Sequence, residues 1–296
     1  MDIQYIDRAT QKKEVEKIAG HRLLLFFYGN SWLSFFCLPL LSRLSFVSKF
    51  YGWLQKKPSS ARNVAPFIQT YKIDSSEFVK TSFTSFNDFF IRKLKRERRP
   101  IIADPRRAAL PADGRYLAFP NVQDVGKFYI KGKSFDLTSL LQNPPYARRY
   151  EEGSMVIARL CPTDYHRYHF IADGIPGKAR EISGDLYSVN PIALHKKLSI
   201  LWTNKRVVTD FETDLFGKVL YIEIGATCVG TIHQTYSPGV RVCKGEEKGY
   251  FSFGGSCLVI LFEKDRIVLD RDLVTHSEQG FETKACFGES LGIALR

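Results

Sequence analysis

Apolar residues near the start of the chain gather in short runs that polar or helix-breaking residues interrupt. The runs cover residues 23–28, 32–41 and 44–53. None reaches the roughly 20 residues that a helix needs to span a bilayer, and Gly29, Pro39 and Arg43 stand between or inside them. Two or three short amphipathic helices are therefore predicted for residues 20–57, in place of a transmembrane helix.

Farther along, the spacing of apolar residues changes. Residues 58–66 indicate a loop, and residues 67–95 are predicted to be helical. The apolar positions at helical spacing there are Phe86, Phe89, Phe90 and Leu94. From about residue 108, short β-rich runs alternate with turn residues, and these runs are 116–119, 127–130, 155–160, 219–224, 258–262 and 266–270. We predict an α+β fold, with a helical membrane-associating region at 1–57 and a β-rich, sandwich- or barrel-like domain at 58–296.

Composition and charge narrow the class of protein. With 44% hydrophobic residues the chain can build a real core, which excludes a mainly disordered protein. The net charge of +12 suits an anionic membrane or a nucleic acid. The densest basic run, residues 92–99, has no nucleic-acid-binding motif around it, so no nucleic-acid partner is expected.

The predicted N-terminal helices combine aromatic residues with cations. The cations are Arg43, Lys49, Lys56 and Lys57. Trp and Phe beside such cations are typical of a helix that lies in the headgroup plane of an anionic membrane. A helical bundle that buries the same faces against the rest of the protein is the alternative.

Cysteine spacing argues against disulfides and metal. The six cysteines stand at positions 37, 161, 228, 243, 257 and 286, without a CxxC pair or a histidine at zinc-finger spacing. Reduced, mostly buried thiols in a reducing compartment are predicted, and no metal site.

Two clusters carry side chains that suit acid–base chemistry. Asp113 lies between Pro111 and Gly114 in a rigid turn that presents one carboxylate, although such a turn alone is an ordinary surface feature. His166 and His169 are three residues apart and would share a face in a helical turn. They could act as an acid–base pair, whereas a catalytic zinc site would need a third ligand.

Two glycine-containing segments precede or follow predicted strands. His233 follows the small-residue segment 225–230 and is either a ligand or, as we favour, a core histidine. Gly254, Gly255 and Ser256 directly precede an apolar strand. Adjacent glycines allow backbone angles that other residues cannot hold, and the Ser256 hydroxyl could reach the preceding carbonyl. No phosphate-binding loop or nucleophile elbow is present, so a bulge or turn is the default interpretation of this segment alone.

Taken in order, the segments resemble one family over nearly the whole chain. They are 86–101 (FNDFFIRKLKRERRPI), 111–114 (PADG), 164–169 (DYHRYH), 184–191 (GDLYSVNP), 225–239 and 244–256 (KGEEKGYFSFGGS). This combination resembles phosphatidylserine decarboxylase, a pyruvoyl-dependent family. The resemblance implies a proenzyme that cuts itself between Gly255 and Ser256 into a long chain, 1–255, and a short chain, 256–296. Ser256 would become the covalent pyruvoyl group.

The resemblance also implies roles for individual residues. Asp113 would orient His169, which takes the proton of Ser256 while its oxygen attacks the Gly255 carbonyl, in the manner of a Ser-His-Asp triad. The pyruvoyl group would then form a Schiff base with the amine of phosphatidylserine and accept electrons as carbon dioxide leaves. His166 would reprotonate the carbanion to give phosphatidylethanolamine. No external cofactor and no metal would be needed.

The implied substrate gives the predicted N-terminal helices a reason to bind a membrane. A two-tailed lipid stays in the bilayer, so we expect a peripheral protein on the cytoplasmic face of the cell membrane, docked through residues 20–57. Deleting residues 1–57 is predicted to abolish membrane association and to leave self-cleavage intact. The resemblance further implies a homodimer of the processed two-chain protein.

Two positions depart from the family pattern, and two other functions fit part of the sequence. Cys257 stands where the family has Thr or Ser, and Ile171 replaces a common proline.

A serine hydrolase using Ser256, His169 and Asp113 would remain one intact chain. An inactive membrane-binding scaffold would not depend on Ser256 at all.

Overall fold

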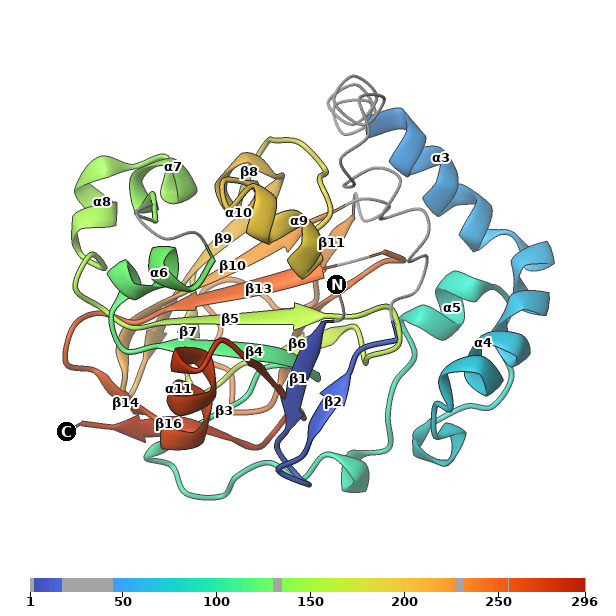
Figure 1. Cartoon of the computed structure of the whole chain (residues 1–296), viewed down its shortest axis with the longest axis horizontal. Helices are drawn as coiled ribbons and strands as arrows, with labels where there is room; N and C mark the ends of the chain where they lie inside the picture. The colour runs from blue at the N-terminus through green and yellow to red at the C-terminus, as the bar shows by residue number, and fades with distance from the viewer. Residues whose placement is uncertain (1–2, 18–44, 130–134, 227–230, 255, 296) are drawn as a thin grey trace.

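The computed structural model describes residues 3–17, 45–129, 135–226, 231–254 and 256–295. A β-rich body lies at the centre, with one group of helices beside its upper edge and another, α3 to α5, at one end (Figure 1). The α-helices are α3 (Ser45–Lys56), α4 (Val64–Tyr71), α5 (Phe86–Phe90), α6 (Val125–Tyr129), α7 (Leu137–Leu141), α8 (Pro144–Arg148), α9 (Pro191–Lys196), α10 (Ile200–Thr203) and α11 (Arg271–Glu278). The short 3-10 helices are η1 (Pro58–Asn63), η2 (Ser75–Glu77), η3 (Arg96–Arg98) and η4 (Val122–Asp124).

One ten-stranded sheet forms the scaffold. Its order is β2 (Lys13–Val15), β1 (Gln4–Asp7), β15 (Glu282–Ala285), β4 (Gly114–Phe119), β5 (Met155–Leu160), β13 (Ser256–Leu261), β10 (Gly217–Gly225), β9 (Arg206–Thr213) and β7 (Gly174–Pro176), with β8 (Arg180–Ile182) also paired to β9. Neighbouring strands are antiparallel except for β1 and β15. Strand β13 therefore lies inside the sheet, hydrogen-bonded on both sides.

Two smaller sheets complete the body. One has the order β11 (Ile232–Gln234), β12 (Glu247–Phe251), β6 (Arg167–His169), and the other β14 (Ile267–Leu269), β16 (Ser290–Ala294), β3 (Arg107–Ala109). The first of them places the sequence segment with both predicted histidines beside the segment that leads into Ser256.

Alternating side chains of β13 divide the apolar core into two layers. Cys257, Val259 and Leu261 belong to a cluster that helices α6 to α10 cover. Leu258 and Ile260 belong to a second cluster that β6, β12, β16 and α11 cover. Ser256 is on the same side as Leu258, so its hydroxyl faces the small sheet that contains the histidines.

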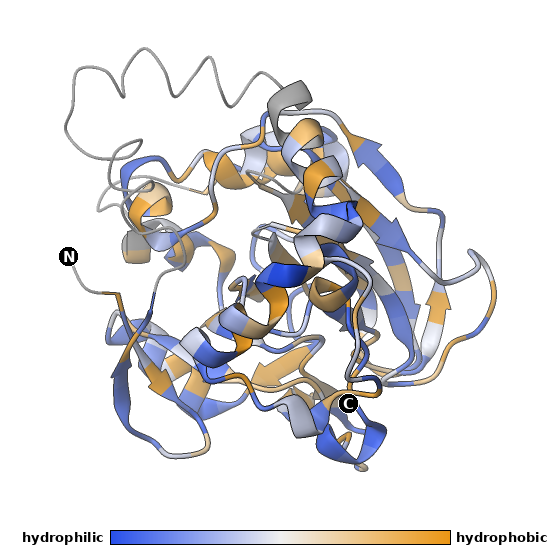
Figure 2. Ribbon diagram, turned by 90° about the vertical axis from the view of Figure 1, so that its right-hand side faces the viewer, coloured by the Kyte–Doolittle hydropathy of each residue, from blue (hydrophilic) through white to orange (hydrophobic). Residues whose placement is uncertain are grey.

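A third cluster joins the helices at one end of the body. Aromatic rings of α5 and its neighbours form it, namely Phe78, Phe86, Phe89 and Phe90, together with Val64. Figure 2 looks onto these helices and shows hydrophobic and hydrophilic residues following one another along them. Phe253, which precedes the glycines, packs against the same cluster. The helical end of the protein is thereby in direct contact with the loop that leads into β13.

The α+β prediction is confirmed, and several local predictions are wrong. Residues 58–66, predicted as a loop, form η1 and the start of α4. Residues 4–7 and 13–15 are strands of the large sheet instead of parts of a helical region. Residues 127–129 belong to α6 instead of a strand, because Val125 packs into the core beneath the sheet as a helical residue. Of the predicted helices at 20–57, residues 45–56 are helical, whereas 20–44 lie outside the described residues.

Three further findings concern the membrane, metals and cysteines. Within the described ranges no helix is long and apolar enough to cross a bilayer. The same ranges contain no group of three or more His, Cys, Asp or Glu side chains that could hold a metal ion. The described cysteines, Cys161, Cys243, Cys257 and Cys286, are all free thiols, and two of them are buried.

Candidate active site at the start of strand β13

Ser256 is the first residue of β13 and is fully buried. It is opposite Leu160 of β5 on one side and Gly225 of β10 on the other. Two flanking strands hold its backbone, so the position of its hydroxyl is set by the centre of the sheet. This rigidity is what a reaction at one precise atom requires.

His166 contacts that hydroxyl directly. Its Nδ1 lies 3.2 Å from Ser256 Oγ, and its Nε2 lies 2.8 Å from the carbonyl oxygen of Cys161. A carbonyl can only accept a hydrogen bond, so Nε2 carries the proton and Nδ1 offers a lone pair to the hydroxyl. The ring of Phe90 stacks on His166 at a centroid distance of 3.8 Å.

Burial keeps His166 neutral. The side chain is completely enclosed, and this desolvation, aided by the nearby charge of Arg92, lowers the pKa of His166 to about 3. A neutral imidazole facing a hydroxyl is in the state that accepts a proton.

His169 lies at the end of β6, in a second buried position. Its Nδ1 is 3.3 Å from the carbonyl oxygen of Pro111, and its ring stacks on Phe287 at 3.7 Å. Burial lowers the pKa of His169 to about 3 as well. Both histidines are therefore uncharged at neutral pH.

Asp113 lies directly before β4 and forms a salt bridge with Arg99. Arg99 donates to both of its carboxylate oxygens, over distances of 2.6 to 3.0 Å, and the backbone N–H of Phe287 donates to Oδ1 at 2.8 Å. Phe287 thus contacts Asp113 through its backbone and His169 through its ring. The structure brings Asp113 and His169 together around Phe287, while Ser256 pairs with His166. Among the described residues, neither Asp113 nor His169 is hydrogen-bonded to Ser256.

Hydrogen bonds fix the backbone at two positions shortly before Ser256. Phe251 N donates to the carbonyl of His166 at 3.0 Å, and Phe253 N donates to Asn87 Oδ1 at 3.0 Å. Gly254 has a φ of 136°, a backbone conformation that residues with a Cβ rarely adopt. Gly255, the other residue of the predicted cut, lies outside the described residues.

His233 does not join this site. Its Nε2 is 3.0 Å from Ser252 Oγ and its ring stacks on Tyr250. It is half-buried, with part of the small sheet around it.

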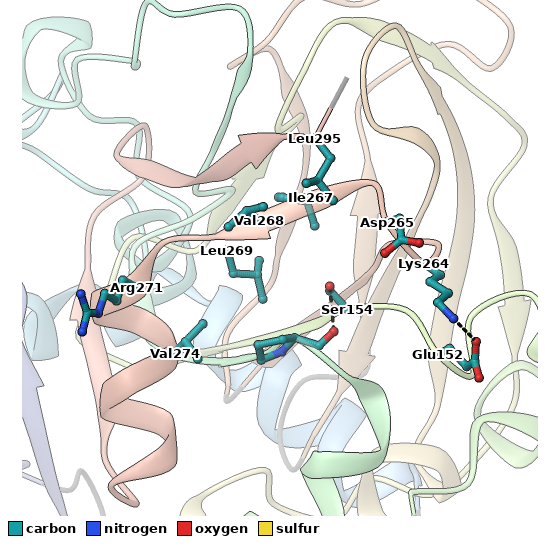
Figure 3. A pocket seen from close by; sticks show the side chains of 11 residues that line it. Glu152, Ser154, Lys264, Asp265, Ile267, Val268, Leu269, Arg271, Val274 and Leu295 are labelled. Atoms are coloured by element: carbon teal, nitrogen blue, oxygen red, sulfur yellow. Dashed lines mark hydrogen bonds and ion pairs between the residues drawn. The ribbon is translucent and has the colours of Figure 1, made fainter.

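A surface hollow elsewhere on the molecule lacks the predicted site residues. It has a volume of about 560 Å³ and lies between β14 and α11, where Val268, Leu269 and Val274 line it, with the Lys264–Glu152 ion pair at its edge (Figure 3). No histidine and no cysteine lines it.

Sequence reasoning missed several residues of the site. The sequence places Asn87, Phe90 and Arg92 in a predicted helix, a basic run and a family motif but gives them no role, and nothing in it distinguishes Phe287. The polar residues of this group, Asn87 and Arg92, are buried beside phenylalanines. Polar residues inside an apolar helical run are the feature that would have marked them.

Comparisons with known proteins agree with the site. A family model described as phosphatidylserine decarboxylase matches residues 86–293. A protein of Chlamydia pneumoniae is 46% identical over 99% of this chain and 98% of its own length. One of Clostridium novyi is 44% identical over 99% of this chain and 100% of its own. Both carry the name phosphatidylserine decarboxylase proenzyme.

These matches, with the α+β fold, define the class of the protein as a decarboxylase. More particularly, the chain belongs to the phosphatidylserine decarboxylase family. The resemblance of its motifs is confirmed.

Proposed function

We propose that the chain cuts itself between Gly255 and Ser256 and that the mature protein decarboxylates phosphatidylserine to phosphatidylethanolamine. The observation that carries the proposal is the buried Ser256 hydroxyl, 3.2 Å from a neutral histidine nitrogen. Two residues before it, Gly254 has a backbone conformation that residues with a Cβ rarely adopt. The name proenzyme of its relatives supports the same conclusion.

Self-cleavage follows from the residues around Ser256. Its oxygen attacks the Gly255 carbonyl, and the amide bond becomes an ester as the peptide nitrogen takes a proton. Removal of the proton on Ser256 Cα then expels the Gly255 carboxylate and leaves dehydroalanine. Hydrolysis releases ammonia and leaves a keto-acyl group at the start of the short chain. Burial of the serine excludes bulk water from the ester until elimination.

The residues present fit a pyruvoyl group at this position. Ser256 is the first residue of a strand and its side chain faces His166. In the pyruvoyl group the former Ser256 Cα would carry the ketone oxygen in place of the lost peptide nitrogen, and the former Cβ, which bore the hydroxyl, would be the methyl group. When formed, this group supplies an electron sink for the electrons of the leaving carboxylate. His166 lies beside the Ser256 side chain and is our candidate to return a proton to the product.

We assign the proton transfer of self-cleavage to His169, oriented by Asp113. Both side chains are buried around Phe287, and the low pKa of His169 keeps it available as a base. A second assignment, favoured by the 3.2 Å contact, gives this step to His166.

Two matched substitutions separate these assignments. His166→Gln and His169→Gln both remove a basic nitrogen and keep a polar side chain. If His169 acts in cleavage and His166 in decarboxylation, H169Q stays one chain, while H166Q is cut but makes no phosphatidylethanolamine. Loss of cleavage in H166Q together with normal cleavage in H169Q would give the step to His166.

Intact mass spectrometry tests the cleavage itself. We expect the wild-type protein to give a long and a short chain, with the short chain carrying a hydrazine-reactive carbonyl. Ser256→Ala should remain one chain of 33.9 kDa. A wild-type protein that converts the lipid as a single uncut chain would disprove the proposal. Covalent labelling of that uncut chain by a fluorophosphonate would instead support a serine hydrolase.

Membrane docking is part of the proposal. On α3, Phe50, Tyr51 and Trp53 expose 58%, 42% and 50% of their surface, and Lys57 Nζ lies 3.7 Å over the ring of Trp53. Exposed aromatic rings beside cations suit the interface of an anionic bilayer. We propose peripheral binding through α3 on the cytoplasmic face of the cell membrane.

The contacts of the N-terminal segment change how docking is tested. Deleting residues 1–57 would remove two strands of the large sheet and leave Arg159 without Glu16, to which it donates at 2.6 Å. Loss of binding after that deletion would therefore not isolate docking. Point substitutions on α3 are the better test.

A double substitution, Phe50→Ser with Trp53→Ser, is expected to weaken binding to phosphatidylserine-containing vesicles about tenfold or more. Each ring that becomes buried in the bilayer contributes about 1.5–3 kcal/mol to binding. Vesicle co-sedimentation measures this effect. Val240→Ser with Val268→Ser removes equally exposed apolar groups elsewhere and serves as the control. Equal binding by both double variants would contradict docking through α3.

A further inference from the structure

Helix α5 contacts both the loop that leads into Ser256 and the ring of His166, which faces the Ser256 hydroxyl. It is a single short helix, Phe86–Phe90, buried on most of its surface. We infer that Asn87, Phe90 and Arg92 are positioning residues, which fix the loop before Ser256 against the turn that carries His166. The inference rests on the proposed self-cleavage and adds the element that sets its geometry.

Asn87 holds the loop before the cut. Its Oδ1 accepts the backbone N–H of Phe253 at 3.0 Å, and the side chain is 8% exposed. Phe253 lies after β12 ends and immediately before Gly254, where the chain has no strand partner among the described residues. A buried N–H without an acceptor is unfavourable, so Asn87 stabilises one conformation of this loop.

Phe90 lies between the loop and the histidine. Its ring centroid is 5.1 Å from that of Phe253 and 3.8 Å from that of His166. Phe86 adds a contact of 5.3 Å with Phe253. A displacement of either partner would open a gap in this buried aromatic stack, which close packing disfavours.

Arg92 holds the turn before His166. Its Nη2 donates to the carbonyls of Thr163 and Asp164, at 3.0 and 3.1 Å. The guanidinium lies over the rings of Phe78 and Phe89, so cation–π contacts fix it from the other side. Three consecutive features of one segment therefore anchor the loop, the imidazole and the turn.

This arrangement orders the segments around Ser256. Ser256 and His166 are 90 residues apart, and strand β13 fixes the first of them. Residues 87–92 hold the loop at 252–254, which leads to the peptide bond to be cut, and the turn before His166. A displacement of about 1 Å can slow a reaction about 100-fold even when no reacting group is altered. Releasing one loop should therefore slow the cut more than it weakens the fold.

The test follows cleavage of the newly made full-length chain. Both methionines, Met1 and Met155, precede the cut, whereas Cys257 and Cys286 follow it, so [35S]cysteine in a cell-free translation labels both products. We expect Asn87→Leu to lower the first-order rate of cleavage by about 10- to 100-fold. Asn87→Asp keeps an acceptor oxygen at the same place and should recover most of the rate.

Asn121→Leu is the matched control. Asn121 Oδ1 also accepts a backbone N–H, that of Gln123 at 2.9 Å, but it follows the far end of β4 from Ser256. This variant should be cut within about twofold of the wild-type rate. Limited proteolysis shows whether Asn87→Leu folds. If it does not fold, Phe90→Leu, which keeps the apolar contact and loses the flat ring, is a second test.

The outcomes separate this inference from the proposed function. If the wild-type chain is never cut, the proposed function fails. If the wild-type chain is cut, and Asn87→Leu or the folded Phe90→Leu is cut at the same rate, α5 has no positioning role. Equal slowing in Asn87→Asp and Asn87→Leu would also overturn the role of the Asn87 oxygen.

Discussion

At the scale of single residues, two histidines have the same charge state for the same reason. Both are buried, and burial lowers the pKa of His166 and of His169 to about 3. The protein therefore begins its reaction with two neutral imidazoles that no solvent water protonates near pH 7. Their neighbours differ, since His166 faces a hydroxyl and His169 faces Phe287 and Pro111.

These lowered pKa values predict acid sensitivity. Each histidine has an ordinary value near 6.5 when unfolded, so between pH 6.5 and 3 the unfolded chain binds protons that the folded one does not. The contribution of each neutral histidine to the free energy of unfolding is fully present above pH 6.5. It is lost as the pH falls below that value, by about 1.4 kcal/mol per pH unit for each histidine. Urea unfolding of the uncut Ser256→Ala protein at pH 7, 6 and 5 measures this slope.

A variant isolates the contribution of one histidine. His169→Phe keeps a ring for the stack on Phe287 and removes the titrating group, so the slope near pH 5 should fall by about 1.4 kcal/mol per pH unit. The same slope in the variant and in its parent would show that His169 is not the source.

The residues of the site could be predicted from the sequence only where local chemistry distinguishes them. Ser256 after two glycines and the pair His166 and His169 are recognisable as motifs. The partner of Ser256 is not, because the 3.2 Å contact with His166 arises from strand pairing between distant segments. The resemblance to a family supplied roles for Asp113 and His169, and these remain predictions.

At the scale of elements, a buried ion pair joins β12 to β10. Lys248 Nζ lies 2.7 Å from Glu223 Oε1, 2.8 Å from Gln234 Oε1 and 3.1 Å from Thr209 Oγ1. Both charged side chains have no exposed surface. Strand β12 leads into the loop before Ser256, so this pair fixes the small sheet against the large one.

Breaking the pair should destabilise the protein strongly. Lys248→Met leaves the buried Glu223 carboxyl without its cation, which we expect to lower the free energy of unfolding by about 3–5 kcal/mol. Adding Glu223→Gln removes the remaining carboxyl and should recover more than half of that loss. Urea unfolding of the Ser256→Ala parent, both single variants and the double variant completes the cycle. Additive losses would mean that the two groups do not stabilise each other.

Element prediction from the sequence succeeded where an apolar run is buried on both faces. Residues 155–160 and 219–224 lie in β5 and β10 as predicted. Residues 127–129 do not, because a short apolar run fits a buried helix equally well. The predicted helix over 67–95 divides into α4, η2 and α5, since Asp74 caps a new turn by accepting from Ser76 N.

At the scale of the whole molecule, the proposed cut leaves the strands of the long and short chains paired with one another. The short chain would keep β13 in the centre of the large sheet, between β5 and β10. It would also keep β15 between β1 and β4, and β16 beside β3. Each of these neighbours belongs to the long chain, so the two products remain interleaved.

This topology predicts that the cut protein stays one particle. Withdrawing β13 would expose Leu258, Val259, Ile260 and Leu261, all fully buried, at a cost of about 1.5–3 kcal/mol for each side chain. Native mass spectrometry of the mature protein should therefore detect long and short chains only as a complex, and a doubled mass would reveal the homodimer that the family resemblance implies. Denaturant should release both chains, with Ser256→Ala as the uncut control. A short chain that is lost during gel filtration in native buffer would contradict the central position of β13.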